Sequence, residues 1–401
     1  MTTPVKGLIV YEMNEPMHYK FPEICHIDDV LSDINGYDEI RVINKGEYTV
    51  INYAVAFEDT FKWDVEDPHA SAIRRECRGL IFDSNGKLIS RPYHKFFNAG
   101  EKEETQLNQI NLYEPHVVLE KLDGSMIRPI PTADGFRLAT KAGITDISEQ
   151  AEKFIADKPN YSNLITYCID KDSTPIFEWC SRKNRIVIDY PEDQLILTAI
   201  RSNKTGFYVP YSILQTLVHD LKVPLVGAVN GLSIQDINLF IQQVREYEDS
   251  EGIVLRFDNG HMIKVKADDY ILKHTTKDQI SQEKNVILTI INDQVDDVIP
   301  LLSDTDADNL YQFQKQFWSN MNELIEKMEK IYTEGNIMYN NQKDFAVEFV
   351  NKMLPIQYRP FMFGMRQGKN LKDMMIESIQ KINTQAKVDE YRWMWGNLKW
   401  K

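Results

Sequence analysis

The chain has 401 residues, and its 46 Lys and Arg against 60 Asp and Glu give a net charge of −14. This charge argues against a protein that coats nucleic acid or anionic membranes through bulk electrostatics, although it leaves room for a local basic groove. A hydrophobic fraction of 43% excludes a disordered chain, and the length allows two domains with sizeable cores.

Four widely spaced cysteines, Cys25, Cys77, Cys168 and Cys180, form no C-x-x-C pair. We therefore expect reduced thiols in a cytoplasmic protein, rather than a disulfide framework or a zinc site. No apolar run reaches the roughly 20 residues that a membrane-spanning helix needs. Met1–Pro16 has no signal-peptide pattern. These features predict a protein without membrane association.

Residues 1–275 predict an α+β domain. Short segments rich in β-branched and aromatic residues, separated by turn residues, predict strands at Tyr48–Ala56, Gly79–Phe82, Val117–Leu119, Phe136–Thr140, Ile176–Cys180, Leu195–Ile200, Ile253–Phe257 and His261–Lys266. Because Asp258-Asn259-Gly260 joins the last two strands directly, it predicts a hairpin. Helices are predicted over Asp146–Ala156 and Tyr211–His219.

Residues 276–401 have a different character. Leu310–Tyr332, Gln342–Met353 and Leu371–Lys387 carry apolar residues at three- and four-residue spacing, which is the helical pattern. We therefore expect an α+β domain followed by an all-α C-terminal domain.

The segment Glu120-Lys121-Leu122-Asp123-Gly124-Ser125 brings a lysine from a predicted strand into an Asp-Gly turn. One interpretation is a simple hairpin turn preceded by an exposed lysine. The other is the lysine nucleophile of a covalent nucleotidyltransferase, which attacks the α-phosphate of ATP. The motif alone leaves both open.

Nucleotidyl transfer to a lysine needs an unprotonated amine, cations for the triphosphate and carboxylates for a divalent metal. Lys264 and Lys266 alternate along one strand face, so both can reach one phosphate. Glu178 and Glu251 lie in otherwise apolar strands. The alternative for the two lysines is an ordinary solvated strand face, and the alternative for the two glutamates is a structural ion pair.

Two more cations precede the lysine motif. Arg78 stands just before an apolar strand, and Lys95 stands between His94 and two phenylalanines. Arg suits bidentate phosphate contacts and Lys a single charged contact, although either residue could instead be a surface residue.

In this order and spacing, the motifs resemble those of the RNA ligase 1 family of T-even bacteriophages, within the covalent nucleotidyltransferase superfamily. The resemblance covers about residues 48–300. It rests on ECRG at Glu76–Gly79, SRPxxKFFN at Ser90–Asn98, KxDGS at Lys121–Ser125, TKAG at Thr140–Gly143, FEW at Phe177–Trp179, NRIV at Asn184–Val187, SEGIV at Ser250–Val254 and IKVKADDY at Ile263–Tyr270.

The resemblance implies a nucleotidyltransferase (ATP-grasp-like ligase) domain with antiparallel sheets, and it implies roles for single residues. Lys121 would be the adenylated nucleophile. The residues that would contact ATP are Tyr53, Arg78, Lys95, Glu178, Glu251, Lys264 and Lys266. Lys141 and Tyr270 match residues needed for activity, and the carboxylates that would hold metal are Glu178, Glu251, Asp296 and Asp297.

The activity implied is ATP-dependent RNA ligation with Mg²⁺, through a lysyl-AMP and an RNA-adenylate, joining a 3′-hydroxyl to a 5′-phosphate. The resemblance further suggests broken tRNA anticodon loops as substrate, and we expect a monomer in the host bacterial cytoplasm. The alternatives are a DNA ligase or capping-type nucleotidyltransferase and, more remotely, a non-catalytic RNA-binding module. The helical pattern after Lys266 disfavours the first, because those enzymes usually continue into a β-rich OB-fold.

The last fifty residues, 352–401, contain ten Lys and Arg and four Asp and Glu, a balance of +6. Trp393, Trp395, Trp400, Tyr358 and Tyr391 lie among them. Such a segment could hold RNA by phosphate contacts and base stacking, or its aromatic residues could form the core of a helical domain. Both interpretations remain open from the sequence.

Overall fold

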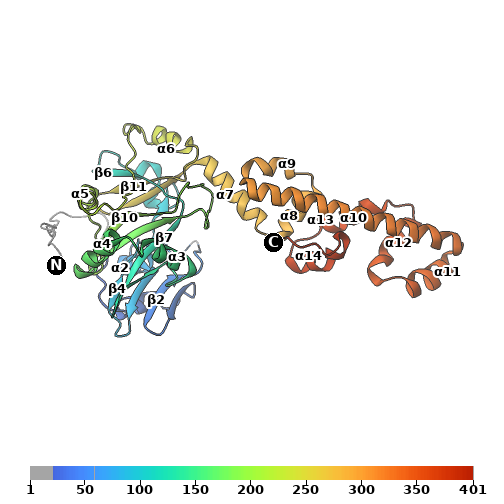
Figure 1. The fold of residues 1–401 in the computed structure, drawn as a ribbon, viewed down its shortest axis with the longest axis horizontal. Helices are drawn as coiled ribbons and strands as arrows, with labels where there is room; N and C mark the ends of the chain where they lie inside the picture. The colour runs from blue at the N-terminus through green and yellow to red at the C-terminus, as the bar shows by residue number, and fades with distance from the viewer. Residues whose placement is uncertain (1–20, 58, 401) are drawn as a thin grey trace. The chain divides into compact units, whose positions relative to one another are not determined.

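The computed structural model describes residues 21–57 and 59–400, and the chain divides into two compact units, Met1–Tyr270 and Ile271–Lys401 (Figure 1). Helix α7 (Asp268–Ile280) contains both this division and the boundary that the sequence predicts at 275/276. The segment Met1–Pro16, for which no signal peptide is predicted, lies outside the described residues. Among the described residues, no helix has both the length and the apolar character needed to cross a bilayer.

Three four-stranded sheets form the first unit. One sheet has the order β1-β2-β3-β4, with β1 (Ile40–Asn44), β2 (Tyr48–Tyr53), β3 (Arg78–Asp83) and β4 (Leu88–Ser90). The second has the order β10-β9-β7-β8, with β7 (Ser125–Thr132), β8 (Gly135–Ala139), β9 (Ser173–Cys180) and β10 (Gln194–Ser202). The third has the order β5-β12-β11-β6, with β5 (Phe97–Asn98), β6 (His116–Glu120), β11 (Gly252–Phe257) and β12 (Met262–Lys266). All strand pairs are antiparallel except β12 with β5.

Helices and short turns of helix complete this unit: α1 (Asp28–Leu31), η1 (Ser32–Ile34), α2 (Pro68–Glu76), η2 (Glu103–Thr105), η3 (Leu107–Gln109), α3 (Asp146–Ile155), α4 (Pro159–Asp170), α5 (Tyr211–Leu221) and α6 (Ile237–Arg245). The α+β class with antiparallel sheets is therefore confirmed. The predicted hairpin at Asp258–Gly260 is also confirmed, since β11 and β12 pair directly across it.

The lysine motif is not a hairpin turn. Strand β6, which ends at Glu120, pairs with β11, whereas β7, which begins at Ser125, pairs with β8 and β9. The segment Lys121–Gly124 therefore carries the chain from one sheet to another. The simple hairpin interpretation of the Asp-Gly pair is wrong.

The second unit is helical throughout its described residues, which is the all-α architecture expected from the sequence. It contains α8 (Glu283–Ile291), α9 (Val295–Val298), η4 (Ile299–Leu301), α10 (Asp304–Met338), α11 (Gln342–Asp344), the π-helical η5 (Phe345–Asn351), η6 (Ile356–Tyr358), α12 (Arg359–Arg366), α13 (Leu371–Gln380), α14 (Gln385–Tyr391) and η7 (Arg392–Trp395). Within this unit, Figure 1 shows the shorter helices arranged along the 35-residue α10.

One predicted helix of this unit is wrong as a single element. Leu371–Lys387 breaks after Gln380, where Ile382 turns into the core with 2% of its surface exposed. The hydroxyl of Thr384 then accepts a hydrogen bond from the amide of Lys387 and starts α14 as an N-cap. Apolar spacing alone gives no sign of this local competition for the backbone amides.

The aromatic residues near the C-terminus divide between core and partly exposed positions. Trp395 is fully buried, and its ring lies 5.3 Å from that of Phe317. Trp400 is 6% exposed and donates its indole N–H to the carbonyl of Ile280. Both are core residues, whereas Trp393 keeps part of its surface exposed beside Tyr358. The core interpretation is therefore confirmed for Trp395 and Trp400.

Candidate active site

A cavity of about 490 Å³ in the first unit contains Lys121. The segment from β6 to β7 supplies the lysine, β9 supplies Glu178, and β3 and the turn after β8 supply Arg78 and Lys141. Leu119, Val226, Val254 and Met262 add apolar surface to the same wall. The cavity thus combines an apolar part that can take a nucleobase with a cationic part that can take phosphates.

Glu251 joins two of the predicted lysines. Its carboxylate is 5% exposed and lies 2.7 Å from Lys121 Nζ through Oε2 and 3.1 Å from Lys266 Nζ through Oε1. Lys121 is held by its backbone as well, since its amide donates to the carbonyl of Gly252 at 2.9 Å. The strand pairing of β6 with β11 therefore sets the distance between the lysine and its carboxylate partner.

Two other site residues have displaced pKa values. Burial raises the pKa of Glu178 to about 7, while the charge of Lys121 lowers it and that of Glu251 raises it further. Burial lowers the pKa of Lys264 to about 8, and nearby Lys95 lowers it as well. Lys264 is thus still mostly charged at pH 7, but, unlike a solvated surface lysine, it loses its charge only about one pH unit above that.

A cluster of three cations surrounds Tyr53. Lys95 Nζ lies 5.3 Å from the centre of its ring and Lys141 Nζ lies 5.1 Å from it. Burial of Tyr53 raises the pKa of its hydroxyl, but the charges of Arg78, Lys95 and Lys141, with a hydrogen bond from Arg78, bring the pKa below its usual value. The structure thus places all four residues, predicted from separate motifs, at one electropositive site.

Asp123, the aspartate of the lysine motif, fixes the turn that carries Lys121. Its carboxylate accepts the amides of Val187 and Ile188, each at 2.7 Å, and the hydroxyl of Tyr270 at 2.7 Å. The backbone amide of Asp123 donates to the hydroxyl of Tyr190 at 2.9 Å. Tyr270 is 3% exposed, so the structure places it against this turn rather than in the open cavity.

A buried ion cluster connects two of the motif segments, ECRG and SRPxxKFFN. Glu76 is paired with Arg201 at 2.7 Å and with Arg91 at 3.1 Å, and all three side chains are almost fully buried. Burial acts to raise the pKa of Glu76, but the two arginines outweigh it and hold the pKa at about 2. Arg78 and Lys95 follow Glu76 and Arg91 closely in the chain, so this cluster anchors the segments that carry them.

A family model described as "RNA ligase" matches residues 76–279 of this chain, which is more than half of it. The chain belongs to this RNA ligase family. The resemblance drawn from the motifs is confirmed.

Individual relatives agree with this assignment. The chain is 29% identical over 258 residues to a Thermovibrio ammonificans protein named as an inferred RNA ligase, covering 62% of this chain and 63% of that one. It is 24% identical over 218 residues to RNA ligase 1 of bacteriophage TS2126, and the match covers 48% of this chain and 50% of the phage protein. It is 22% identical over 380 residues to the RNA ligase of Rhodothermus phage RM378, and the match covers 76% of this chain and 85% of the phage protein. The chain thus spans less than two thirds of the length of the first two relatives.

Among solved structures, the chain is similar to an archaeal ATP-dependent RNA ligase, with 12% identity and a TM-score of 0.43. The match covers 76% of this chain and 78% of the archaeal one.

The carboxylates predicted to hold metal in this RNA ligase family member fall into two groups. Glu178 and Glu251 belong to the site around Lys121, whereas Asp296 and Asp297 are exposed residues of α9 in the second unit. In the described parts of the chain, no three His, Cys, Asp or Glu side chains converge on one point. Glu251 contacts Lys121 and Lys266, and Glu178 lines the same cavity as Lys121.

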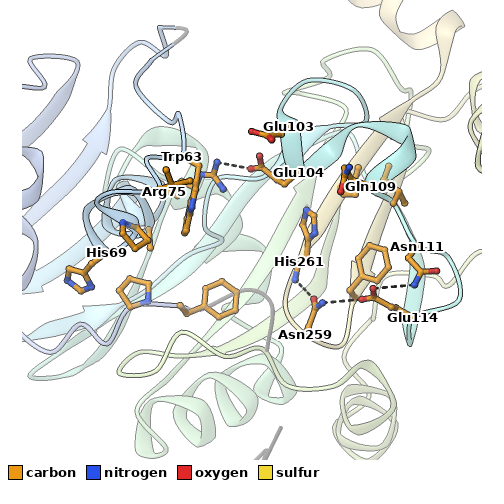
Figure 2. Close-up of a pocket in the computed structure, with 18 of the residues that line it drawn as sticks. Trp63, His69, Arg75, Glu103, Glu104, Gln109, Asn111, Glu114, Asn259 and His261 are labelled. Atoms are coloured by element: carbon orange, nitrogen blue, oxygen red, sulfur yellow. Dashed lines mark hydrogen bonds and ion pairs between the residues drawn. The ribbon is translucent and has the colours of Figure 1, made fainter. Parts of the chain in front are cut away.

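A larger cavity of about 960 Å³ lies elsewhere in the first unit (Figure 2). Trp63, Arg75, Glu104 and His261 line it, and an ion pair of 2.7 Å joins Arg75 to Glu104. It contains none of the predicted site residues. The smaller cavity is the candidate active site, because Lys121, Glu178, Arg78 and Lys141 line it and Glu251 contacts Lys121.

Sequence reasoning missed two residues of the site. The sequence predicts Asp123 only as part of an Asp-Gly turn, although its position two residues after the proposed nucleophile suggests that it could orient that turn. Arg128 of β7 is 0% exposed and its guanidinium donates to the carbonyls of Gly79 and Thr140. The sequence gives no signal for it, since an arginine in a strand is usually exposed.

Proposed function

We propose that this chain is an ATP-dependent RNA ligase that joins a 3′-hydroxyl to a 5′-phosphate through a lysyl-AMP and an RNA-adenylate. The observation that carries the proposal is Lys121 Nζ, 2.7 Å from the carboxylate of Glu251, in a cavity that also holds Glu178, Arg78 and Lys141. Family membership supports the same reaction.

In the first step, Lys121 Nζ attacks the α-phosphorus of ATP, a P–N bond forms and the bond to pyrophosphate breaks. The amine must lose a proton before it attacks, and Glu251 Oε2 is the nearest group placed to accept it. Lys264 and Lys266 lie on the same strand, β12, and would balance charge on the α-phosphate.

The β- and γ-phosphates would occupy the cationic cluster around Tyr53. Arg78 offers bidentate hydrogen bonds, and Lys95 and Lys141 offer point charges from two other segments. The lowered pKa of the Tyr53 hydroxyl supports this assignment, because it reports a site in which negative charge is favoured.

A divalent cation fits the carboxylate oxygens of Glu178 and Glu251, which are hard donors of the kind that Mg²⁺ prefers. These two residues would hold it, and it would offset the charge of the departing pyrophosphate. Asp296 and Asp297, exposed residues of α9, stay a separate prediction as metal ligands.

In the second step the 5′-phosphate of an RNA attacks lysyl-AMP, which releases Lys121 and forms a pyrophosphate link to AMP. In the third, a 3′-hydroxyl attacks that activated 5′-phosphate and AMP leaves. The same cations would serve both steps. We propose that the helical unit contributes RNA choice, with a broken tRNA anticodon loop as one substrate to be tested.

The competing enzyme, a DNA ligase or capping-type nucleotidyltransferase, shares the lysine chemistry. The helical character of the described residues after Tyr270 disfavours it, and every side chain needed for adenylylation is present, which disfavours an inactive RNA-binding module.

The function is tested with a single-stranded RNA that carries a 5′-phosphate and with a nicked DNA duplex of the same sequence. We expect ATP-dependent circularisation of the RNA, lost in Lys121→Ala, and little sealing of the nick. Preferential sealing of nicked DNA would overturn the assignment.

A further inference from the structure

Arg128 is a buried cation without a counter-charge. It lies on β7, its side chain is 0% exposed, and within the described chain it forms no ion pair with a carboxylate. Its Nε has no hydrogen-bond partner. A buried guanidinium normally has a carboxylate partner, because an isolated charge is costly to remove from water.

The two contacts of Arg128 lead directly to the phosphate cluster. Nη1 donates to the carbonyl of Thr140 at 3.1 Å and Nη2 donates to the carbonyl of Gly79. The next residue after Thr140 is Lys141, and the residue before Gly79 is Arg78. One guanidinium therefore connects the backbones that present two of the three cations around Tyr53.

The same two backbones touch each other. Gly79 has a φ of +102°, and a Cβ there would lie 2.7 Å from the carbonyl oxygen of Lys141 and 2.9 Å from its Cα. Only glycine permits this approach. Arg128 closes the contact from the β7 side and fixes the spacing of Arg78 and Lys141.

We propose that Arg128 is a positioning residue for the triphosphate: it holds Arg78 and Lys141 at the spacing that a triphosphate requires, and the bound polyanion provides its missing counter-charge. This role rests on the proposed ligase function. Burial lowers the pKa of Arg128 to about 9, against the influence of Tyr48, which raises it, and the charge of Arg78 lowers it as well.

The role predicts a separation between the steps of ligation. Lysyl-AMP formation uses the triphosphate, whereas sealing of a pre-adenylated RNA does not. Arg128→Lys keeps the charge but replaces the planar fork that spans both carbonyls with a single ammonium group, and Arg128→Met removes charge and donors together. A matched control is Arg137→Met on the paired strand β8, whose side chain is 43% exposed and contacts Glu149 and Glu152.

The experiment uses the full-length protein and measures three quantities: equilibrium binding of ATP and of AMP, the rate of lysyl-AMP formation, and sealing of pre-adenylated RNA without ATP. In both Arg128 variants we expect ATP affinity to fall at least tenfold and AMP affinity to change less than twofold. Lysyl-AMP formation at low ATP should fall in parallel, with pre-adenylated sealing within twofold of wild type. Arg137→Met should match wild type throughout.

Two results would overturn the proposal. One is unchanged ATP affinity in both Arg128 variants. The other is an equal loss of ATP binding, AMP binding and pre-adenylated sealing, which indicates a general structural role. If Arg128→Met folds poorly, Arg128→Lys decides by the same criteria. Failure of the proposed function is recognised separately, because wild type would then bind ATP without forming a covalent adduct.

Discussion

Lys264 links the pH dependence of the site to one side chain. Its pKa of about 8 means that the free protein carries it mostly charged at pH 7 and mostly neutral at pH 9. Phosphate binding favours the charged form, so ATP binding should take up a proton above pH 8 and weaken as the pH rises. Calorimetry in buffers of different ionisation enthalpy measures this uptake.

Lys264→Arg is the control for this prediction, because arginine stays charged over the same range. Proton uptake at pH 9 should largely disappear in that variant, and its ATP affinity should be nearly constant from pH 7 to pH 9. Equal proton uptake in wild type and in Lys264→Arg would show that another group titrates.

The pKa of Glu178 predicts that Mg²⁺ binding weakens as the pH falls, whereas ATP binding is expected to weaken as the pH rises. With a pKa of about 7, its carboxylate is mostly ionised at pH 8 and mostly protonated at pH 6. If it holds Mg²⁺, the Mg²⁺ concentration for half-maximal lysyl-AMP formation should rise about tenfold between pH 8 and pH 6. Glu178→Gln should need more Mg²⁺ at both pH values, without this dependence. A wild-type requirement that does not change with pH would contradict the assignment.

At the scale of elements, the turn after β6 depends on Asp123. Tyr270→Phe removes one of the three hydrogen bonds that its carboxylate accepts and leaves the two from Val187 and Ile188. We expect the free energy of unfolding to fall by about 1 kcal/mol, with slower lysyl-AMP formation because the turn carries Lys121. Denaturant titration and single-turnover labelling measure the two effects. Unchanged labelling would show that Tyr270 does not position the nucleophile.

Elements were predictable where apolar patterning was strong. Strands β9 to β12 are core strands. The sequence predicts β10, β11 and β12 to within two residues at each end, whereas it begins β9 three residues late. Strand β1 was missed because only Ile40 of its five residues is buried, so no alternation marks it. The predicted helix over Gln342–Met353 contains η5, but the spacing of its apolar residues does not distinguish a π-helical turn from an α-helix.

The residues of the candidate site were likewise predictable where a local sequence motif contains them. Motif spacing predicted Lys121 and its cations, and the structure brings Tyr53, Arg78, Lys95 and Lys141 together. No local pattern could show that β6 and β7 enter different sheets, because that depends on long-range pairing. For the same reason the sequence could not reveal Arg128, whose role depends on two segments that meet only in the fold.

At the scale of the whole molecule, the net charge of −14 means that the proposed RNA binding must depend on few cations. In the basic C-terminal segment, Arg366 and Arg392 are occupied by contacts with Asn336 and Glu283. Lys369, Lys372 and Lys381 are exposed and remain candidates for phosphate contacts. With Trp395 and Trp400 in the core, base stacking by those two residues is excluded.

Replacing Lys369, Lys372 and Lys381 together with Gln should weaken binding of single-stranded RNA and leave lysyl-AMP formation unchanged. Each lost phosphate contact should reduce the slope of log K against log salt by about 0.7. Fluorescence anisotropy at several salt concentrations gives the slope. An unchanged slope would show that the helical unit does not bind RNA through these lysines.

The central claim, that Lys121 carries the nucleotide, is tested most directly by incubating the full-length protein with α-labelled ATP and Mg²⁺ and mapping the label by peptide mass spectrometry. The account predicts one labelled site, at Lys121, which disappears in Lys121→Ala and is discharged by 5′-phosphorylated RNA. Absence of covalent label in wild type, or label that persists in Lys121→Ala, would contradict it.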